Sequence, residues 1–151
     1  KFLVTSTKFK EEANKKNHIK QGFLNSHPER VVRVRLVNDK GLLTIKGKSD
    51  DEGVSRFEWE TEIRAQDANK LLTLCERPII EKYRYEVPLG NHVFEVDEFL
   101  KENEGLVIAE VELNHKDEKF SRPPWLGQEV TGNQRYYNSN LVNYPYKNWQ
   151  K

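Results

Sequence analysis

Charged and apolar residues alternate along most of this sequence, and the segment 31–36 shows the pattern in its simplest form. It reads VVRVRL, so Arg33 and Arg35 stand two residues apart between branched apolar side chains. In a β-strand, successive side chains point to opposite faces of the sheet. The two arginines therefore share one face of the predicted strand, and Val34 and Leu36 share the other.

The same alternation recurs in five further segments, which are 42–48, 54–63, 79–87, 92–99 and 106–113. The sign of the charge is grouped by segment: VRVRL, LTIKG and EKYRY are mainly basic, whereas FEVDEF and AEVEL are acidic. Short turns join the segments, including NDKG at 38–41 and SDDEG at 49–53. Many short strands joined in this way predict an antiparallel sandwich or barrel, and closure into a barrel would remove the sheet edges.

One segment has the period of a helix instead of a strand. In QDANKLLTLCE, at 66–76, apolar residues recur every three or four positions up to Cys75, and Asp67 is expected to be the N-cap. The predicted fold class is therefore α+β and mainly β, with strands predominating.

Two interpretations of the charged strand faces are open at this point. In an ordinary amphipathic sheet the apolar face covers the core and the charges face solvent. In the alternative, the apolar faces pack outward against helices and the charges line a tunnel. Arginines in such a tunnel would suit phosphate oxygens, and carboxylates would suit Mg²⁺, which is the combination that metal-assisted phosphoryl chemistry requires.

Length and composition restrict the remaining choices. The 151 residues predict one domain spanning 1–151, and the 25 basic against 24 acidic residues argue against a general nucleic-acid binder. Cys75 is the single cysteine, so no internal disulfide can form, and no apolar run approaches membrane-spanning length. We therefore expect a cytoplasmic protein with no nucleic-acid or membrane partner. The aromatic tail is compatible with a homodimer contact.

Taken in order, these segments resemble the CYTH family, the triphosphate tunnel metalloenzymes. The matching stretches are KFLV, QGFL, VRVRL, LTIKG, SRFEWE, EKYRY, FEVDEF, LVIAEVEL and WLGQEVTGNQRYYNSNL. The family signature is a Glu-x-Glu-x-Lys strand followed by Phe-Leu-Val. Lys1 matches the signature lysine, so the two glutamates would precede residue 1, and we expect the given sequence to lack the beginning of its N-terminal strand.

The resemblance implies a closed antiparallel β-barrel that forms a tunnel, with helices packed outside. It also implies hydrolysis of a triphosphate with Mg²⁺ or Mn²⁺, and the short bacterial members that are most similar look like inorganic triphosphatases, although many carry the label adenylate cyclase. The alternatives are a class IV adenylate cyclase and an organic triphosphatase acting on thiamine triphosphate or a nucleoside triphosphate. A non-catalytic, polyphosphate-binding barrel is the alternative from another functional class.

The same resemblance assigns roles to individual residues. It implies phosphate binding by Arg33, Arg35, Lys46, Arg56, Lys82 and Arg84. It implies metal binding by Glu110, Glu112, Glu58 and Asp97. Lys1, Lys82 and Glu60 are the expected catalytic residues.

Overall fold

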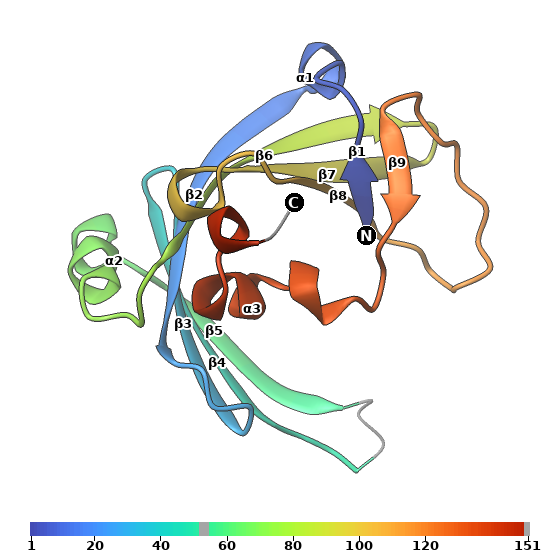
Figure 1. Ribbon diagram of the computed structural model, residues 1–151. Helices are drawn as coiled ribbons and strands as arrows, with labels where there is room; N and C mark the ends of the chain where they lie inside the picture. The colour runs from blue at the N-terminus through green and yellow to red at the C-terminus, as the bar shows by residue number, and fades with distance from the viewer. Residues whose placement is uncertain (52–54, 150–151) are drawn as a thin grey trace.

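The computed structural model describes residues 1–51 and 55–149, and one nine-stranded sheet dominates it (Figure 1). Neighbouring strands are antiparallel, in the order β5-β4-β3-β2-β6-β7-β8-β1-β9. The strands are β1 (Phe2–Val4), β2 (Lys15–Asn25), β3 (Arg30–Val37), β4 (Lys40–Ser49), β5 (Arg56–Ile63), β6 (Ile80–Leu89), β7 (His92–Phe99), β8 (Val107–Val111) and β9 (Leu126–Glu129). The helices are α1 (Phe9–Glu12), α2 (Ala65–Leu72) and α3 (Asn138–Asn143), with 3₁₀ turns η1 (Lys101–Asn103), η2 (Gln134–Tyr136) and η3 (Tyr146–Asn148).

The prediction of a mainly β, antiparallel fold is confirmed, and the predicted strands fall on β1 to β8. Strand β2 extends from the QGFL stretch back to Lys15, because the polar residues 15–21 pair with β6 along their whole length. The predicted turn at 49–53 and the start of the strand at 54 include residues 52–54, which lie outside the described residues.

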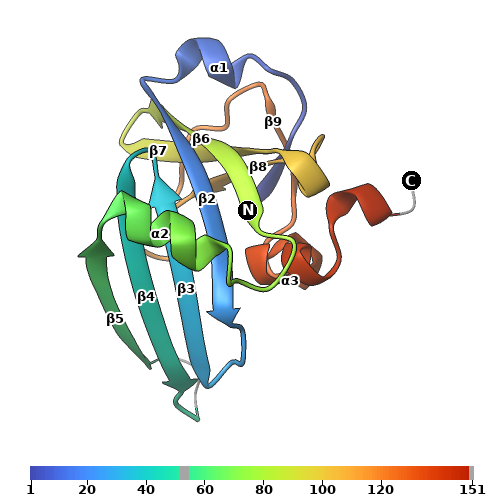
Figure 2. The ribbon, with the colours of Figure 1, turned by 90° about the vertical axis from the view of Figure 1, so that its left-hand side faces the viewer.

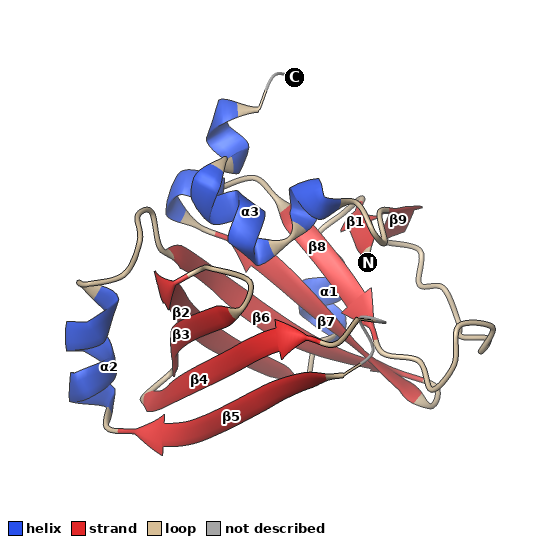
Figure 3. Cartoon of the chain, turned by 90° about the horizontal axis from the view of Figure 1, so that it is seen from below, coloured by secondary structure: helices blue, strands red, loops and turns tan. Residues whose placement is uncertain are grey.

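The prediction of a closed barrel is wrong for the described residues, because hydrogen bonds leave the sheet open. Strands β5 and β9 are its two edges and do not pair with each other. Figures 1 and 3 show a strongly curved sheet, in which β2 to β5 face the strands from β6 onward on the concave side. We call this concave side the trough, and the C-terminal segment that carries α3 lies at one end of it.

Apolar side chains on the convex face of the sheet are covered by helix α2. Val34 and Leu36 of β3 are buried against Ala68, Leu72 and Cys75. Figure 2 shows α2 lying across the outside of β2, β3 and β4. Because side chains alternate along β3, burying Val34 and Leu36 under this helix turns the intervening arginine toward the trough.

The other half of the sheet buries its convex face in the same way. Phe9 of α1 and Trp125, both almost fully buried, pack against residues of β6, β7 and β8, which include Tyr85, Val87, Phe94, Val96 and Ala109. Edge-to-face ring pairs link Phe9 and Phe94 to Trp125, at centroid distances of 5.9 and 5.6 Å. The expectation of helices outside the sheet therefore holds for α1 and α2.

Helix α3 departs from that expectation, because it packs on the concave side. Leu141 and Val142 are buried against apolar residues that interrupt the charged faces of four strands, namely Phe23, Ile80, Phe99 and Ile108. The trough is thus apolar at the end that α3 covers and charged elsewhere.

The limits of α2 also differ from the sequence prediction. The helix begins at Ala65 with Arg64 as N-cap, so Asp67 lies in the first turn, where it accepts a 2.8 Å hydrogen bond from Arg64. A carboxylate in the first turn still suits the helix dipole. Among the described residues, no helix has the length and apolarity needed to cross a membrane.

The packing of α2 makes a prediction about stability. Leu72 is 4% exposed, whereas Leu74, two residues later, is 71% exposed. Leu72→Ala should lower the free energy of unfolding by about 3 kcal/mol, because it leaves a cavity under the helix. Leu74→Ala is the matched control and should change it by less than about 0.5 kcal/mol. Urea unfolding measures both, and equal effects would show that α2 does not seal the convex face.

Candidate functional site

The concave face of the sheet gathers charged side chains from strands far apart in the sequence. Register places Arg33, Arg35, Lys46, Glu58, Glu60, Lys82, Arg84, Glu86, Glu95, Asp97 and Glu110 on this face. All the predicted site residues that lie on β3 to β8, except Arg56, are thus brought to one surface. The tunnel-like interpretation describes the direction of these side chains, although the sheet stays open.

Four cationic side chains crowd the middle of the trough: Arg33, Arg35, Lys82 and Arg84. The pKa of Arg35 falls to about 10, mainly because of burial and further because Arg33 and Arg84 are near. Burial also lowers the pKa of Arg33, whose buried Nε atom has no hydrogen-bond partner in the part of the chain that the structure describes. Like charges with a desolvated, unpartnered donor make a site that an anion would stabilise.

Asp97 of β7 organises two of these cations. Its two oxygens accept from Nε and Nη2 of Arg84, at 2.7 and 2.9 Å, and one also lies 2.9 Å from Nζ of Lys82. Burial alone would raise the pKa of Asp97, but the two cations lower it to about 2. Likewise the Asp97 bonds outweigh burial and raise the pKa of Arg84. The carboxylate therefore holds the forked Arg84 guanidinium in one orientation.

Lys82 is the most enclosed of the four cations, because its side chain is fully buried. Burial lowers its pKa to about 8, although Asp97 opposes this effect. A second contact comes from the C-terminal segment, where Oδ1 of Asn138 accepts from Nζ at 3.2 Å. Lys82 is thus linked to Arg84 through Asp97 and is shielded from solvent.

Strands β4 and β5 place carboxylates beside this cationic cluster. Glu60 accepts a 2.6 Å hydrogen bond from the Thr44 hydroxyl and lies 3.9 Å from Arg33. Glu58 pairs with Lys46 at 3.5 Å. Arg56 is directed elsewhere, because its guanidinium donates to the backbone carbonyls of Gly47 and Pro28, at 2.6 and 2.8 Å.

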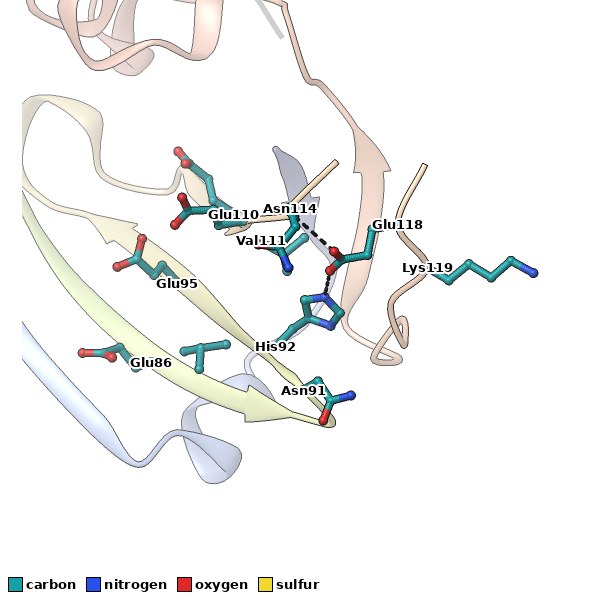
Figure 4. Close-up of a pocket in the computed structure, with 11 residues that line it drawn as sticks. Glu86, Asn91, His92, Glu95, Glu110, Val111, Asn114, Glu118 and Lys119 are labelled. Carbon is teal, nitrogen blue, oxygen red and sulfur yellow. Dashed lines mark hydrogen bonds and ion pairs between the residues drawn. The ribbon is translucent and has the colours of Figure 1, made fainter. Parts of the chain in front are cut away.

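Glutamates gather at the other side of the trough and line a cavity of about 920 Å³ (Figure 4). Glu86, Glu95 and Glu110 are cross-strand neighbours on β6, β7 and β8, and Glu112 also lines the cavity. Glu110 forms a 2.7 Å ion pair with Lys1. Like charges placed directly opposite one another destabilise a sheet, and the other two carboxylates of this row are also offset by cations: Glu95 pairs with Arg84 at 3.6 Å and Glu86 with Lys15 at 3.8 Å.

The carboxylate oxygens of these glutamates are suitable ligands for a hard divalent cation. Mg²⁺ prefers oxygen ligands and typically takes one or two carboxylates, with water and phosphate oxygens completing the shell. Within residues 1–51 and 55–149, no group of three or more His, Cys, Asp or Glu side chains is arranged to hold a metal ion. A metal here would therefore need ligands beyond this set.

Some residues of the site were missed by the analysis of the sequence. Gln21 is buried to 1% exposure and accepts a 3.2 Å hydrogen bond from Arg35. Asn138 contacts Lys82 from the C-terminal tail, to which the sequence analysis gave no part in the site. The parity of Gln21 within its strand was a signal for that residue, whereas no local pattern singles out Asn138 among the polar residues of the tail.

Comparison with known proteins gives a matching family and two similar relatives. The CYTH domain model matches residues 1–141. The inorganic triphosphatase of Acetivibrio thermocellus is 50% identical over 152 residues, which cover 100% of this chain and 96% of that protein. The inorganic triphosphatase of Nitrosomonas europaea is 32% identical over 128 residues, covering 82% of this chain and 83% of that protein.

Solved structures show the same fold. The crystal structure of an inorganic triphosphatase superposes with a TM-score of 0.72 at 29% identity, covering 93% of each chain. A protein from Pyrococcus furiosus, 19% identical with a TM-score of 0.51, covers 76% of this chain and 77% of its own and shares the fold alone. With the family model spanning most of its length, this chain belongs to the CYTH domain family.

Proposed function

We propose that this protein hydrolyses inorganic triphosphate in the trough, with the help of a divalent metal ion. The observation that carries the proposal is the cluster of Arg33, Arg35 and Arg84, in which the buried Nε of Arg33 has no hydrogen-bond partner among the described residues. The two curated relatives are both inorganic triphosphatases, which supports the same substrate. A linear triphosphate carries negative charges that would balance the positive charges of this cluster.

The arginines would hold the phosphate oxygens and neutralise charge as the transition state forms. Guanidinium groups donate in a forked geometry that suits phosphate, and a partly desolvated site strengthens each contact. We call these arginines the clamp. Lys46, half-buried on β4, would extend the clamp along the chain of phosphates. Lys82, whose ammonium is fully buried, would add positive charge to the site next to Arg84. Arg56 is less well supported as a phosphate ligand, because its guanidinium donates to backbone carbonyls.

Hydrolysis also needs a water molecule aligned with the terminal phosphorus. Glu60 is the carboxylate beside the clamp, and it is fixed by Thr44. We assign it to orienting that water and accepting its proton, which is general base catalysis. Lys1, which pairs with Glu110 on the acidic side, would contact the phosphates at that end.

The metal ion, Mg²⁺ or Mn²⁺, would be held by Glu110 and Glu112, with Glu58 a further proposed ligand from the opposite half of the sheet. Bound there, it would supply Lewis-acid neutralisation of phosphate oxygens. Asp97 was also predicted as a metal ligand, but its oxygens accept from Lys82 and Arg84, which favours an orienting role instead.

The proposed function is tested by measuring phosphate release from inorganic triphosphate, ATP and thiamine triphosphate, with Mg²⁺, Mn²⁺ or excess chelator. We expect inorganic triphosphate to be cleaved fastest, and chelator to abolish the activity. Release that continues in chelator would contradict the metal assignment. Formation of a cyclic nucleotide from ATP without phosphate release from triphosphate would contradict the triphosphatase.

A second prediction separates the two faces of β3. Arg33→Ala removes an inward guanidinium and should lower kcat/KM for triphosphate by roughly 10²- to 10³-fold, as loss of one preorganised donor does. Arg30→Ala is the matched control, because Arg30 is exposed on the same strand at the opposite parity. It should leave kcat/KM within about twofold of the wild type. Equal losses in both variants would mean that the trough is not the binding site.

A third prediction concerns water activation. Glu60→Gln keeps the size and the Thr44 contact but cannot accept a proton, so kcat should fall by about 10²-fold with little change in KM. Glu62→Gln, two residues along the same strand, changes a glutamate that is 66% exposed and paired with Lys40. That control should keep the wild-type kcat. Steady-state kinetics at saturating metal measures kcat and KM for both variants. An unchanged kcat in Glu60→Gln would remove Glu60 from this role.

A further inference from the structure

We propose that Asn138, the first residue of α3, is a positioning residue for the phosphate site. Its amide oxygen holds the Lys82 ammonium against Asp97, and Asp97 in turn fixes Arg84. The inference rests on the proposed function in that the cationic cluster is taken to bind triphosphate. It gives the C-terminal segment a part in that site beyond covering one end of the trough.

The first step of the argument is the enclosure of Lys82. Its side chain is 0% exposed, so the ammonium depends on protein acceptors rather than water. Among the described residues, those acceptors are Oδ2 of Asp97 at 2.9 Å and Oδ1 of Asn138 at 3.2 Å, and the ring centroid of Phe99 lies 5.4 Å from the same nitrogen. A buried ammonium is costly unless it is hydrogen-bonded, so loss of the Asn138 oxygen would leave the Lys82 side chain poorly held.

The second step leads from Lys82 to the substrate. Asp97 is 8% exposed and binds Arg84 through both of its oxygens. Oδ2 is shared between Lys82 and the Arg84 fork. A displaced Lys82 would therefore change the hydrogen bonds of that oxygen and allow Asp97 to turn. Arg84 also pairs with Glu95 at 3.6 Å, but the forked bond to Asp97 that sets the direction of its guanidinium would be disturbed.

The third step is that α3 is a rigid support. Leu141 and Val142, one helical turn after Asn138, are 0% and 3% exposed. They belong to the apolar cluster that includes Ile80 and Phe99. Ile80 stands two residues before Lys82 on β6, and Phe99 of β7 is the cross-strand partner of Lys82. The helix is thus anchored to the backbone that carries Lys82.

The choice of an amide also fits the proposal. An asparagine oxygen accepts a hydrogen bond from Lys82 without adding a negative charge close to the cationic cluster. An aspartate in its place would keep the acceptor but repel the substrate. The two properties can therefore be separated by substitution.

The experiment compares three variants with the wild type in steady-state triphosphate hydrolysis. Asn138→Leu removes the acceptor, Asn138→Asp keeps it and adds charge, and Asn143→Leu is the control. Asn143 lies on the same helix and is exposed, and within the described part of the chain its amide donates to the helix backbone at Ser139. We expect kcat/KM to fall roughly tenfold in Asn138→Leu relative to Asn143→Leu. Asn138→Asp should keep kcat near the wild-type value while KM rises severalfold.

A binding measurement keeps this inference separate from the proposed function. Inorganic triphosphate with excess chelator should raise the melting temperature of the wild type and of Asn143→Leu more than that of Asn138→Leu. A wild type that is protected but does not hydrolyse triphosphate would contradict the proposed function, and the binding comparison would still decide the role of Asn138. Equal protection together with equal kcat/KM in Asn138→Leu and Asn143→Leu would overturn the inference. So would an Asn138→Asp variant whose kcat falls about tenfold below that of the wild type.

Discussion

The structure depends on burial of apolar side chains on the convex face of a curved sheet. Helix α2 covers Val34 and Leu36, and Phe9 and Trp125 cover the opposite half. Once these side chains are buried, strand geometry fixes the direction of the others, because each alternate side chain must face the trough. The hydrophobic effect on one side thus holds Arg33, Arg35 and Arg84 on the other, where water and ions can reach part of the cluster.

Concentrating charge in this way carries a cost that the network around Asp97 reduces. One carboxylate satisfies Lys82 and Arg84, while Gln21 supports Arg35 and Thr44 supports Glu60. The glutamates of β6, β7 and β8 remain grouped opposite one another. A cationic region beside an acidic one in a single trough is complementary to a polyphosphate and its metal ion, and the relatives named inorganic triphosphatases agree with that chemistry.

Much of this arrangement could be predicted because it follows from local patterns. The strands, the parity of Arg33 and Arg35 and the apolar stripe of α2 all depend on spacing within one segment. The open edges at β5 and β9, the position of α3 and the start of β2 were not predicted. Each of these depends on contacts between segments, such as Leu141 against Ile80, or Lys15–Gln21 along β6.

The sequence by itself determined which side chains share a face, since alternation along a strand needs no partner. It also determined, through the ordered family resemblance, that the charged faces converge. Only the tertiary structure decided that Asp97 binds two cations, that Arg56 turns to backbone carbonyls, and that Asn138 reaches Lys82 across 56 positions of the chain. The reason is physical: a hydrogen bond depends on distance and direction in space, and packing of distant segments sets both.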